Sequence, residues 1–166
     1  MRRAFSGPRR QGKEVKIAPM DQMDFHFGVP NRALYACRLI KKVTGMGLSV
    51  AVWSTNRFFL RRVYDDLYRF EDLTFIAHAW AGSEHAADCR VIFSDSLQQL
   101  PKSDVIVLLD DNVPQDWEKA LEPFGRAVDI VSVSQSDVVP ARERYRTYLR
   151  AKVNLKAHDL SKLKRQ

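Results

Sequence analysis

The sequence has few of the features that mark secreted or membrane proteins. Only two of its 166 residues are cysteine, and without a secretory signal we expect both as reduced thiols. The longest apolar runs, such as LSVAVW at 48–53 and VIVLL at 105–109, are far shorter than the ~20 residues that span a bilayer. The basic first residues are not followed by the apolar stretch of a signal peptide. These absences predict a soluble, cytoplasmic protein with no membrane contact.

Glycine is too sparse to build a phosphate-binding loop. The junction between the first expected strand and helix reads FGVPNRAL, with a single glycine, whereas a nucleotide-binding α/β protein has a glycine-rich turn there. The GMG at 45–47 follows a helix and is explained as its C-terminal cap. Because the chain has no GKS or GKT and no Ser/His/Asp or Cys/His set, we expect no cofactor and no catalytic site.

Charge is plentiful but concentrated at the two ends. Residues 1–22 hold six basic and two acidic residues, a net charge of +4, and residues 141–166 hold nine and two, a net charge of +7. Since the whole chain carries +7, residues 23–140 carry −4. A general duplex binder would spread its basic residues over one wide face. The positive charge here therefore serves a local purpose.

The spacing of apolar residues predicts one α/β domain at 23–155. With 45% hydrophobic residues the chain can fill a single core, and apolar runs alternate with amphipathic segments. This order favours a mostly parallel, Rossmann-like sheet with helices on both faces. A flexible basic extension, 1–22, and a basic tail, 156–166, are expected outside it. Strands are expected at 25–29, 48–54, 73–80, 90–94, 103–111 and 127–133, and helices at 32–45, 56–70, 115–125 and after 137.

The chain has two groups of residues that could hold a metal ion. His78, His85, Asp88 and Cys89 offer nitrogen, oxygen and sulfur ligands for zinc. Their spacing matches no common zinc motif, so a surface loop is the simpler interpretation.

Two acidic residues, Asp110 and Asp111, form the second group. They end a buried strand at the edge of the sheet where α/β proteins hold Mg²⁺, which would suit an enzyme. Beside an asparagine and a proline, however, they are more typical of a turn.

The last helix carries the densest positive charge. In ARERYRTYLRAKVNL, at 141–155, Arg142 and Arg146 lie one turn apart with Tyr145 beside them. A nucleic acid, a membrane surface and an acidic peptide all suit such charge. Arginine pairs with phosphate or carboxylate, and tyrosine adds an apolar contact. Of the three candidate ligands, single-stranded nucleic acid and an acidic peptide therefore fit this helix best. The structural alternative packs Tyr148 on the sheet and turns the arginines to solvent.

The same segment resembles the last helix of a known family, the chi subunit of bacterial DNA polymerase III. That helix has an R-x-R-Y-(K/R)-x-Y run followed by N-L, and FHFGV, LSVAVWS, TFIAHAWAG and VDIV match upstream in order. The resemblance covers about residues 23–154. It implies a Rossmann-type accessory subunit of a DNA-directed DNA polymerase, without activity of its own. The matching helix residues are Arg142, Arg144, Tyr145, Arg146, Tyr148, Asn154 and Leu155.

The resemblance implies that the chain bridges two partners. Chi subunits bind the C-terminal tail of the single-stranded-DNA-binding protein, which ends in acidic residues, proline and phenylalanine. Arginines would bind the carboxylates, and Tyr145 with Val131 would hold the phenylalanine ring. Carried over by position, the tail pocket consists of Val131, Arg142, Tyr145, Arg146 and Asn154.

The second implied partner is the psi subunit, which ties chi to the clamp loader, so that contact with DNA is indirect. Tyr68 and Phe75 stand at the matching aromatic positions, although Phe75 would suit the core equally well. The chain would then be a monomer within a heterodimer. The alternative function is a stand-alone nucleic-acid-binding protein that uses its two basic ends.

Overall fold

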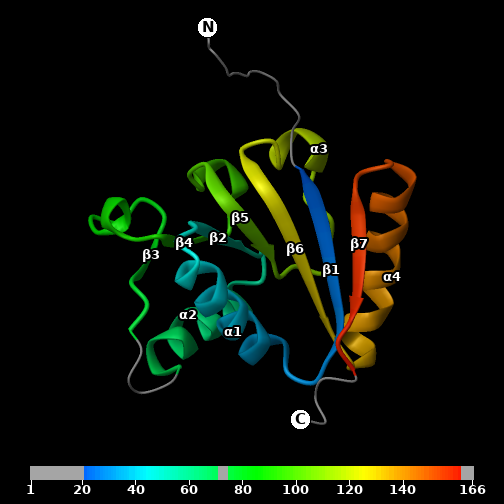
Figure 1. Ribbon diagram of the computed structural model, residues 1–166, viewed down its shortest axis with the longest axis horizontal. Coiled ribbons are helices and arrows are strands. Elements are labelled where there is room, and N and C mark those ends of the chain that lie inside the picture. The colour runs from blue at the N-terminus through cyan, green and yellow to red at the C-terminus, as the bar shows by residue number, and fades with distance from the viewer. Residues whose placement is uncertain (1–20, 71–74, 162–166) are drawn as a thin grey trace, which may run out of the picture.

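The computed structural model describes residues 21–70 and 75–161, which form one seven-stranded sheet (Figure 1). All strand pairs are parallel, in the order β3-β4-β2-β5-β6-β1-β7. This confirms the predicted Rossmann-like α/β fold. The strands are β1 (Gln22–Val29), β2 (Val50–Trp53), β3 (His78–Trp80), β4 (Val91–Ser94), β5 (Ser103–Leu108), β6 (Phe124–Ser132) and β7 (Leu155–Asp159).

Helices cover both faces of the sheet. On one face α1 and α2 pack against each other and the strands, and on the other face lie α3 and α4. No helix in the described part of the chain is long and apolar enough to cross a membrane. The helices are α1 (Arg32–Gly45), α2 (Arg57–Arg69), α3 (Trp117–Ala120) and α4 (Gln135–Arg150), with short 3₁₀ turns at Ala86–Asp88 and Leu97–Gln99.

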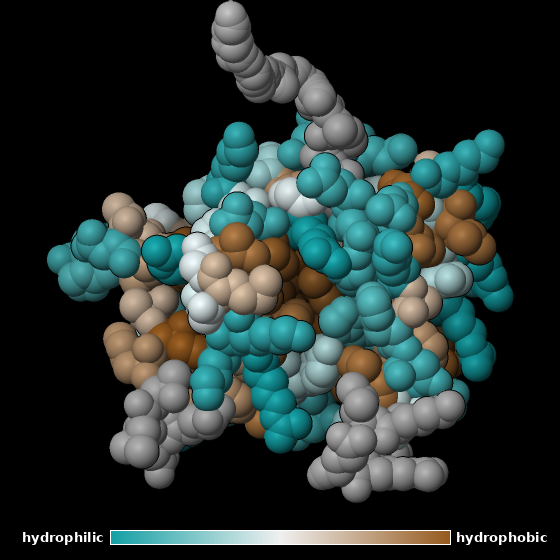
Figure 2. All heavy atoms as spheres, viewed as in Figure 1, coloured by the Kyte–Doolittle hydropathy of each residue, from teal (hydrophilic) through white to brown (hydrophobic). Residues whose placement is uncertain are grey.

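Alternation along the strands divides the core into two layers. On β6, Val128 and Ile130 point toward α1 and α2, whereas Ala127 and Val131 point toward α4. All four residues of β2 are buried, as expected for a strand covered on both faces. The face shown in Figure 2 is mostly hydrophilic, with smaller groups of hydrophobic residues between.

Both long helices of the first layer begin where the sequence predicts. The Asn31 side chain accepts a hydrogen bond from the backbone N–H of Leu34 at 3.0 Å, and that of Asn56 accepts one from Phe59 at 3.1 Å. Each asparagine thereby satisfies a backbone donor that the first turn of a helix leaves without an intrahelical partner.

The end of the chain differs from the prediction. Leu155–Asp159 forms β7 at the edge of the sheet, so the segment expected as a basic tail from 156 begins inside the fold. Most side chains of this edge strand are exposed. Its sequence, LKAHD, is therefore polar and lacks the apolar pattern that indicates a strand. At the other end, residues 1–20 of the expected extension lie outside the described residues, and Gln22 already belongs to β1.

Two helix boundaries also differ. α3 has only four residues, Trp117–Ala120, whereas the sequence predicts a longer helix ended by Pro123 and Gly125; Gly125 already belongs to β6. α4 begins after Ser134, so Pro140 lies in its second turn and not in the first. Proline removes one backbone donor there, and the helix continues past it.

Candidate functional site

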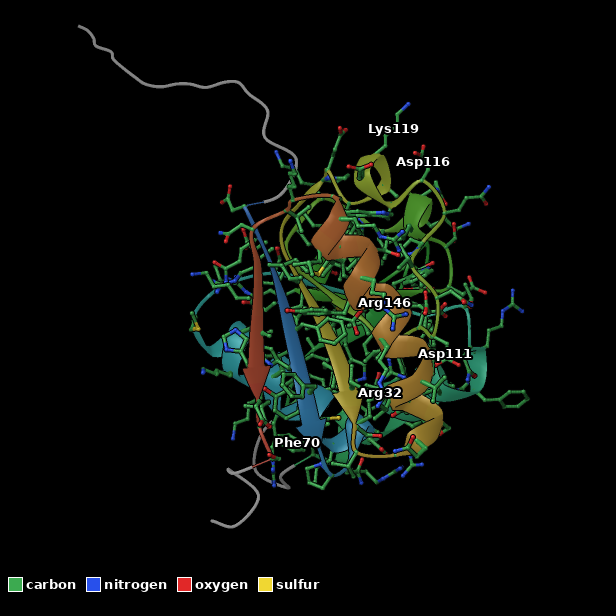
Figure 3. All side chains as sticks on the ribbon, turned by 90° about the vertical axis from the view of Figure 1, so that its right-hand side faces the viewer. Arg32, Phe70, Asp111, Asp116, Lys119 and Arg146 are labelled. Atoms are coloured by element: carbon green, nitrogen blue, oxygen red, sulfur yellow. The ribbon has the colours of Figure 1, made fainter. Side chains whose placement is uncertain are left out.

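A groove runs between α4 and the edge of the sheet formed by β6, β1 and β7. It encloses about 690 Å³, within the ~300–1,000 Å³ typical of ligand sites. In Figure 3, α4 lies in front of β6 with β1 and β7 beside it, and Arg146 is labelled near the middle of the helix. The apolar lining comes from Phe25, Phe27, Val131, Val138, Ala141 and Tyr145.

The floor of the groove follows from the period of two along β1. Phe25 and Phe27 occupy alternate positions, so both point toward α4, while Asp24 and His26 point to the opposite face. The Tyr145 ring meets Phe25 edge-on, with ring centroids 5.2 Å apart. This contact holds one side of the Tyr145 ring against the floor.

A glycine allows the chain to close one end of the groove. Gly28 has a φ of +80° and lies at a β-bulge between Phe27 and Val29. A Cβ atom there would come within 3.0 Å of the Ser161 backbone nitrogen. Beside it, the Leu160 N–H donates to the Phe27 carbonyl at 2.9 Å. Glycine is therefore required for the segment after β7 to pass this close.

One arginine of α4 anchors the helix and does not face the groove. Arg144 is 3% exposed, and its Nε and Nη2 each donate to one Asp129 carboxylate oxygen at 2.9 Å. Its Nη1 donates to the Asp111 carbonyl at 2.8 Å. Burial lowers the pKa of Arg144, but the carboxylate prevails and raises it, so the arginine stays charged.

Two other arginines of α4 line the groove. Arg142 is exposed and has no ion-pair partner among residues 21–70 and 75–161. Arg146 is 59% exposed and contacts Glu143 one turn away. Exposed pairs of this kind contribute only ~0–1 kcal/mol, so an incoming carboxylate can replace Glu143.

Four of the five residues expected in the tail pocket line this groove, namely Val131, Arg142, Tyr145 and Arg146. Asn154 lies elsewhere, at the start of β7. Its carbonyl accepts from the Met23 N–H at 3.0 Å, and its amide donates to the Asp21 carbonyl at 3.4 Å. It therefore joins the beginnings of β1 and β7.

Sequence reasoning missed part of the lining. Phe25 and Phe27 form the floor, and β7 adds Ala157 and Asp159 on one side. The alternating aromatics of DFHFG were a usable signal for the floor, because alternate residues of a strand share a face. The segment LKAHD gave no indication that β7 forms one side of the groove.

The second pair of predicted residues lies at the opposite edge of the sheet. Tyr68 on α2 is 51% exposed and Phe75 is 74% exposed, so the core interpretation of Phe75 is wrong. Their ring centroids are 6.4 Å apart. The Tyr68 ring also lies 4.1 Å from that of His78 on β3. Two exposed aromatic rings thus lie together on this surface.

The residues considered for zinc do not converge. Both ring nitrogens of His78 lie at hydrogen-bonding distance from backbone carbonyls, those of Ile76 at 2.7 Å and Tyr64 at 2.8 Å. In the described part of the chain, His78, His85, Asp88 and Cys89 form no group close enough to hold one ion.

The carboxylate considered for magnesium has a local structural role. Asp110 accepts hydrogen bonds from the backbone N–H and the hydroxyl of Thr55, both at 2.6 Å, and from the Ser54 hydroxyl at 3.1 Å. It thereby fixes the turn between β2 and α2. Asp111 is 62% exposed, and its Oδ1 lies 4.0 Å from Nη1 of Arg32 (Figure 3).

Comparison with solved structures identifies the fold alone. The C-terminal domain of the DEAD-box protein Dbp5 superposes with a TM-score of 0.55 at 9% identity, covering 85% of this chain and 91% of that one. An S. cerevisiae Dbp5 variant bound to Nup159, Gle1, IP6 and ADP superposes with a TM-score of 0.58 at 8% identity, covering 90% and 44%. Among curated proteins, none matches the chain significantly in sequence.

The family comparison is specific. Residues 20–156 match the family model of the DNA polymerase III chi subunit, HolC, a range that includes all seven residues of the C-terminal motif and most of the described fold. The match spans well over half of the chain. The protein therefore belongs to the family of DNA polymerase III chi subunits, the accessory subunits of a polymerase that replicates DNA.

Proposed function

We propose that this chain links single-stranded-DNA-binding protein to the clamp loader of the polymerase. The groove beside α4 would bind the acidic C-terminal tail of the single-stranded-DNA-binding protein, and the Tyr68–Phe75 surface would bind the psi subunit. The chain would act in the cytoplasm without a catalytic site of its own, as a monomer within the heterodimer.

One observation carries the tail-binding proposal: the same groove holds an apolar floor and Arg142, which has no ion-pair partner among the described residues. Tyr145 packs on Phe25 beside Val131, while Arg142 and Arg146 border them. A tail that ends in phenylalanine presents an apolar ring and a carboxylate together. Arginine forms strong charge-assisted hydrogen bonds with carboxylates, and the floor would cover the ring.

The opposite edge of the sheet supports the psi assignment. Tyr68 and Phe75 expose large aromatic surfaces, and aromatic side chains are enriched at protein interfaces. The two arginines nearest Tyr68 along α2, Arg69 and Arg62, both pair with Asp66. An apolar partner surface would therefore contact these two aromatic rings, and the charges beside them are already paired within α2.

The deciding experiment measures binding of three fluorescent ligands by polarisation. One is a peptide with the acidic tail and its terminal phenylalanine, the second lacks that phenylalanine, and the third is a single-stranded oligonucleotide. Selective binding of the complete peptide is expected. Equal binding of the oligonucleotide would favour the stand-alone nucleic-acid-binding function.

Variants then locate the binding site. Tyr145→Ala should weaken peptide binding at least ~10-fold, the equivalent of about 1.4 kcal/mol. Arg150→Ala serves as the matched control, because Arg150 is exposed on the same helix but does not line the groove. A loss that is equal in both variants would contradict the proposed position of the tail.

A further inference from the structure

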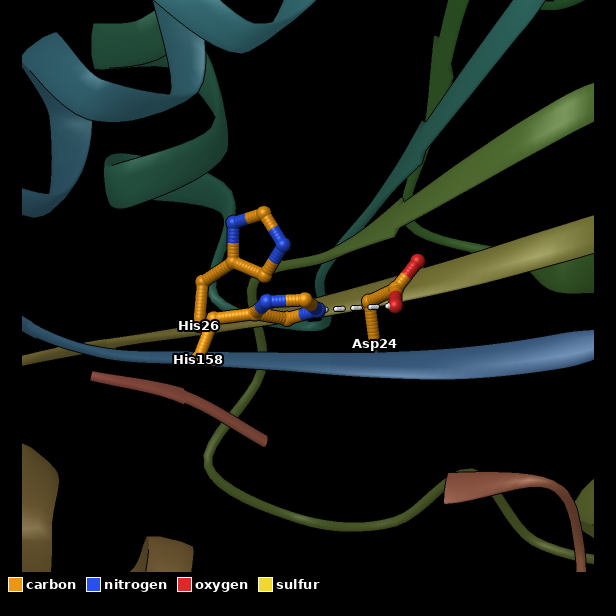
Figure 4. A group of neighbouring side chains, drawn as sticks. All are labelled: Asp24, His26 and His158. Atoms are coloured by element: carbon orange, nitrogen blue, oxygen red, sulfur yellow. Dashed lines mark hydrogen bonds and ion pairs between the residues drawn. The ribbon is translucent and has the colours of Figure 1, made fainter. Parts of the chain in front are cut away.

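A second cluster of side chains lies on the face of the β1–β7 pair opposite the groove. Asp24 and His26 of β1 and His158 of β7 come together there (Figure 4), with one potential ligand atom of each within 4.8 Å of the others. His26 and His158 are register partners in the parallel pair. Their ring centroids are 4.8 Å apart, so the strand pairing itself brings the two imidazoles together.

The distances are close to those of a tetrahedral metal site. His158 Nε2 lies 3.1 Å from Asp24 Oδ1, whereas two ligand atoms at ~2.0–2.1 Å from a tetrahedral zinc ion are about 3.3 Å apart. In Figure 4 each imidazole has one nitrogen on the side of Asp24. All three ligand atoms lie within 4.8 Å of one another, so the longest separation would have to shorten by up to roughly 1.5 Å, which a rotation of one imidazole about its side-chain bonds can provide.

Neighbouring residues orient the three groups. The Tyr35 hydroxyl lies 2.6 Å from His26 Nδ1, so an ion on Nε2 would leave the proton on Nδ1 and a hydrogen bond to the tyrosine oxygen. Arg126 Nε donates to Asp24 Oδ2 at 2.7 Å, which turns Oδ1 toward the histidines. Such outer partners fix the tautomer and direction of metal ligands.

One existing hydrogen bond would have to give way to the ion. Gln22 Nε2 donates to Asp24 Oδ1 at 2.6 Å and would give up this contact, while Arg126 keeps Oδ2.

We propose that Asp24, His26 and His158 bind one divalent transition-metal ion of the zinc type, with a fourth position open to water. Two imidazoles and one carboxylate are a ligand set that zinc accepts. The ion would join the edge strand β7 to β1. Ala157 and Asp159, on either side of His158, line the groove, so the ion would also steady one groove wall. The metal site itself does not depend on the proposed function.

The first test is a calorimetric titration of the untagged full chain, stripped with EDTA and dialysed, with ZnCl₂. We expect one ion per chain with a dissociation constant below about 10 µM, since zinc sites with several protein ligands bind tightly. His158→Asn and His26→Gln should each weaken binding by ~10–100-fold or more. His85→Asn is the control, because His85 is an exposed histidine outside the cluster and should leave binding unchanged.

A second measurement separates metal binding from a structural role. Thermal unfolding of the wild type should shift upward when ZnCl₂ replaces EDTA, by mass action, and the shift should be absent in His158→Asn. The visible spectrum of bound Co²⁺ should likewise disappear in this variant. No binding at about 100 µM Zn²⁺, or equal shifts in both proteins, would overturn the proposal and leave the Asp24–His158 contact as a hydrogen bond only.

Discussion

Two arginine-rich helices flank opposite edges of the same sheet, and they present very different surfaces. On α2, beside the β3 edge, Arg61 pairs with Asp65 at 3.3 Å and Arg62 with Asp66 at 3.6 Å, one helical turn on. On α4, beside the β7 edge, Arg142 has no acidic partner within the described part of the chain. The two helices differ in the positions of acidic residues relative to the arginines, and not in the number of arginines.

The spacing of acids decides what each edge offers a partner. Aspartates four residues after arginines neutralise part of the surface of α2, and the exposed rings of Tyr68 and Phe75 add apolar contact surface at this edge. On α4 the charge of Arg142 is left beside an apolar groove. One edge therefore suits an apolar protein surface, and the other suits an acidic peptide with an apolar end.

The largest expected effect comes from the buried arginine of the β7 edge. Arg144→Met should lower the free energy of unfolding by about 3–5 kcal/mol, because Asp129 would remain buried without its partner. Arg61→Met at the β3 edge should cost less than about 1 kcal/mol, since the Arg61–Asp65 pair is exposed. Urea unfolding of both variants measures the difference. Equal losses would mean that the two arginines are not in such different environments.

The second effect is a pH dependence of the β7 edge. The folded state lowers the pKa of His26 from its ordinary 6.5 to about 4, so between these values the unfolded chain binds a proton that the folded chain does not. Stability should therefore fall by up to about 3 kcal/mol as the pH drops through this window.

The pKa of Asp24 is also lowered. Burial raises it, but hydrogen bonds from Arg126, His158 and Gln22 outweigh burial, so further stability should be lost at still lower pH. Urea unfolding in EDTA measures the His26 effect between pH 7 and about 4, and the Asp24 effect in the same series continued below pH 4. His26→Gln should flatten the upper part of the profile and His85→Gln should not. An unchanged profile in His26→Gln would show that another group titrates.

A smaller effect compares the arginines of the two edges as ligands for the acidic tail peptide. Arg142→Glu should weaken peptide binding at least ~10-fold, about 1.4 kcal/mol, and binding should also weaken with salt because exposed charges are screened. Arg61→Glu should change binding less than ~2-fold despite the same change in net charge. If both reversals act alike, the peptide responds to total charge and not to the groove.

The smallest effect on the fold is expected for the aromatic pair. Phe75→Ala should change the free energy of unfolding by less than about 0.5 kcal/mol, because the side chain is 74% exposed. The same variant should weaken binding of the psi subunit, measured by calorimetry, while Arg142→Glu should leave it unchanged. Intact psi binding in Phe75→Ala would remove this surface from the proposal.

Much of the fold was accessible from local sequence patterns. Asn31 and Asn56 begin helices as predicted because an asparagine cap acts on the N–H three residues later. The buried strands were recognisable because both of their faces are apolar. The groove residues Arg142, Tyr145 and Arg146 were found together because helical spacing places them on adjoining turns.

Other features depend on contacts between distant parts of the chain. The position of Asn154 depends on how β7 pairs with β1, and no local pattern contains that register. Helical spacing places Arg142 and Arg144 on different sides of α4 but does not show which side faces the sheet; in the structure Arg144 is buried against Asp129 and Arg142 is exposed. Which arginine meets an acid is decided by how α4 packs on β6.

The sequence by itself determined the alternation of strands and helices, their caps and the arginine spacing of α4, because each depends on residues within a few positions of one another. Only the tertiary structure decided that β7 completes the sheet, that Phe25 and Phe27 form the floor of the groove, and that His26 meets His158. These contacts arise from strand register, which joins segments far apart in the chain.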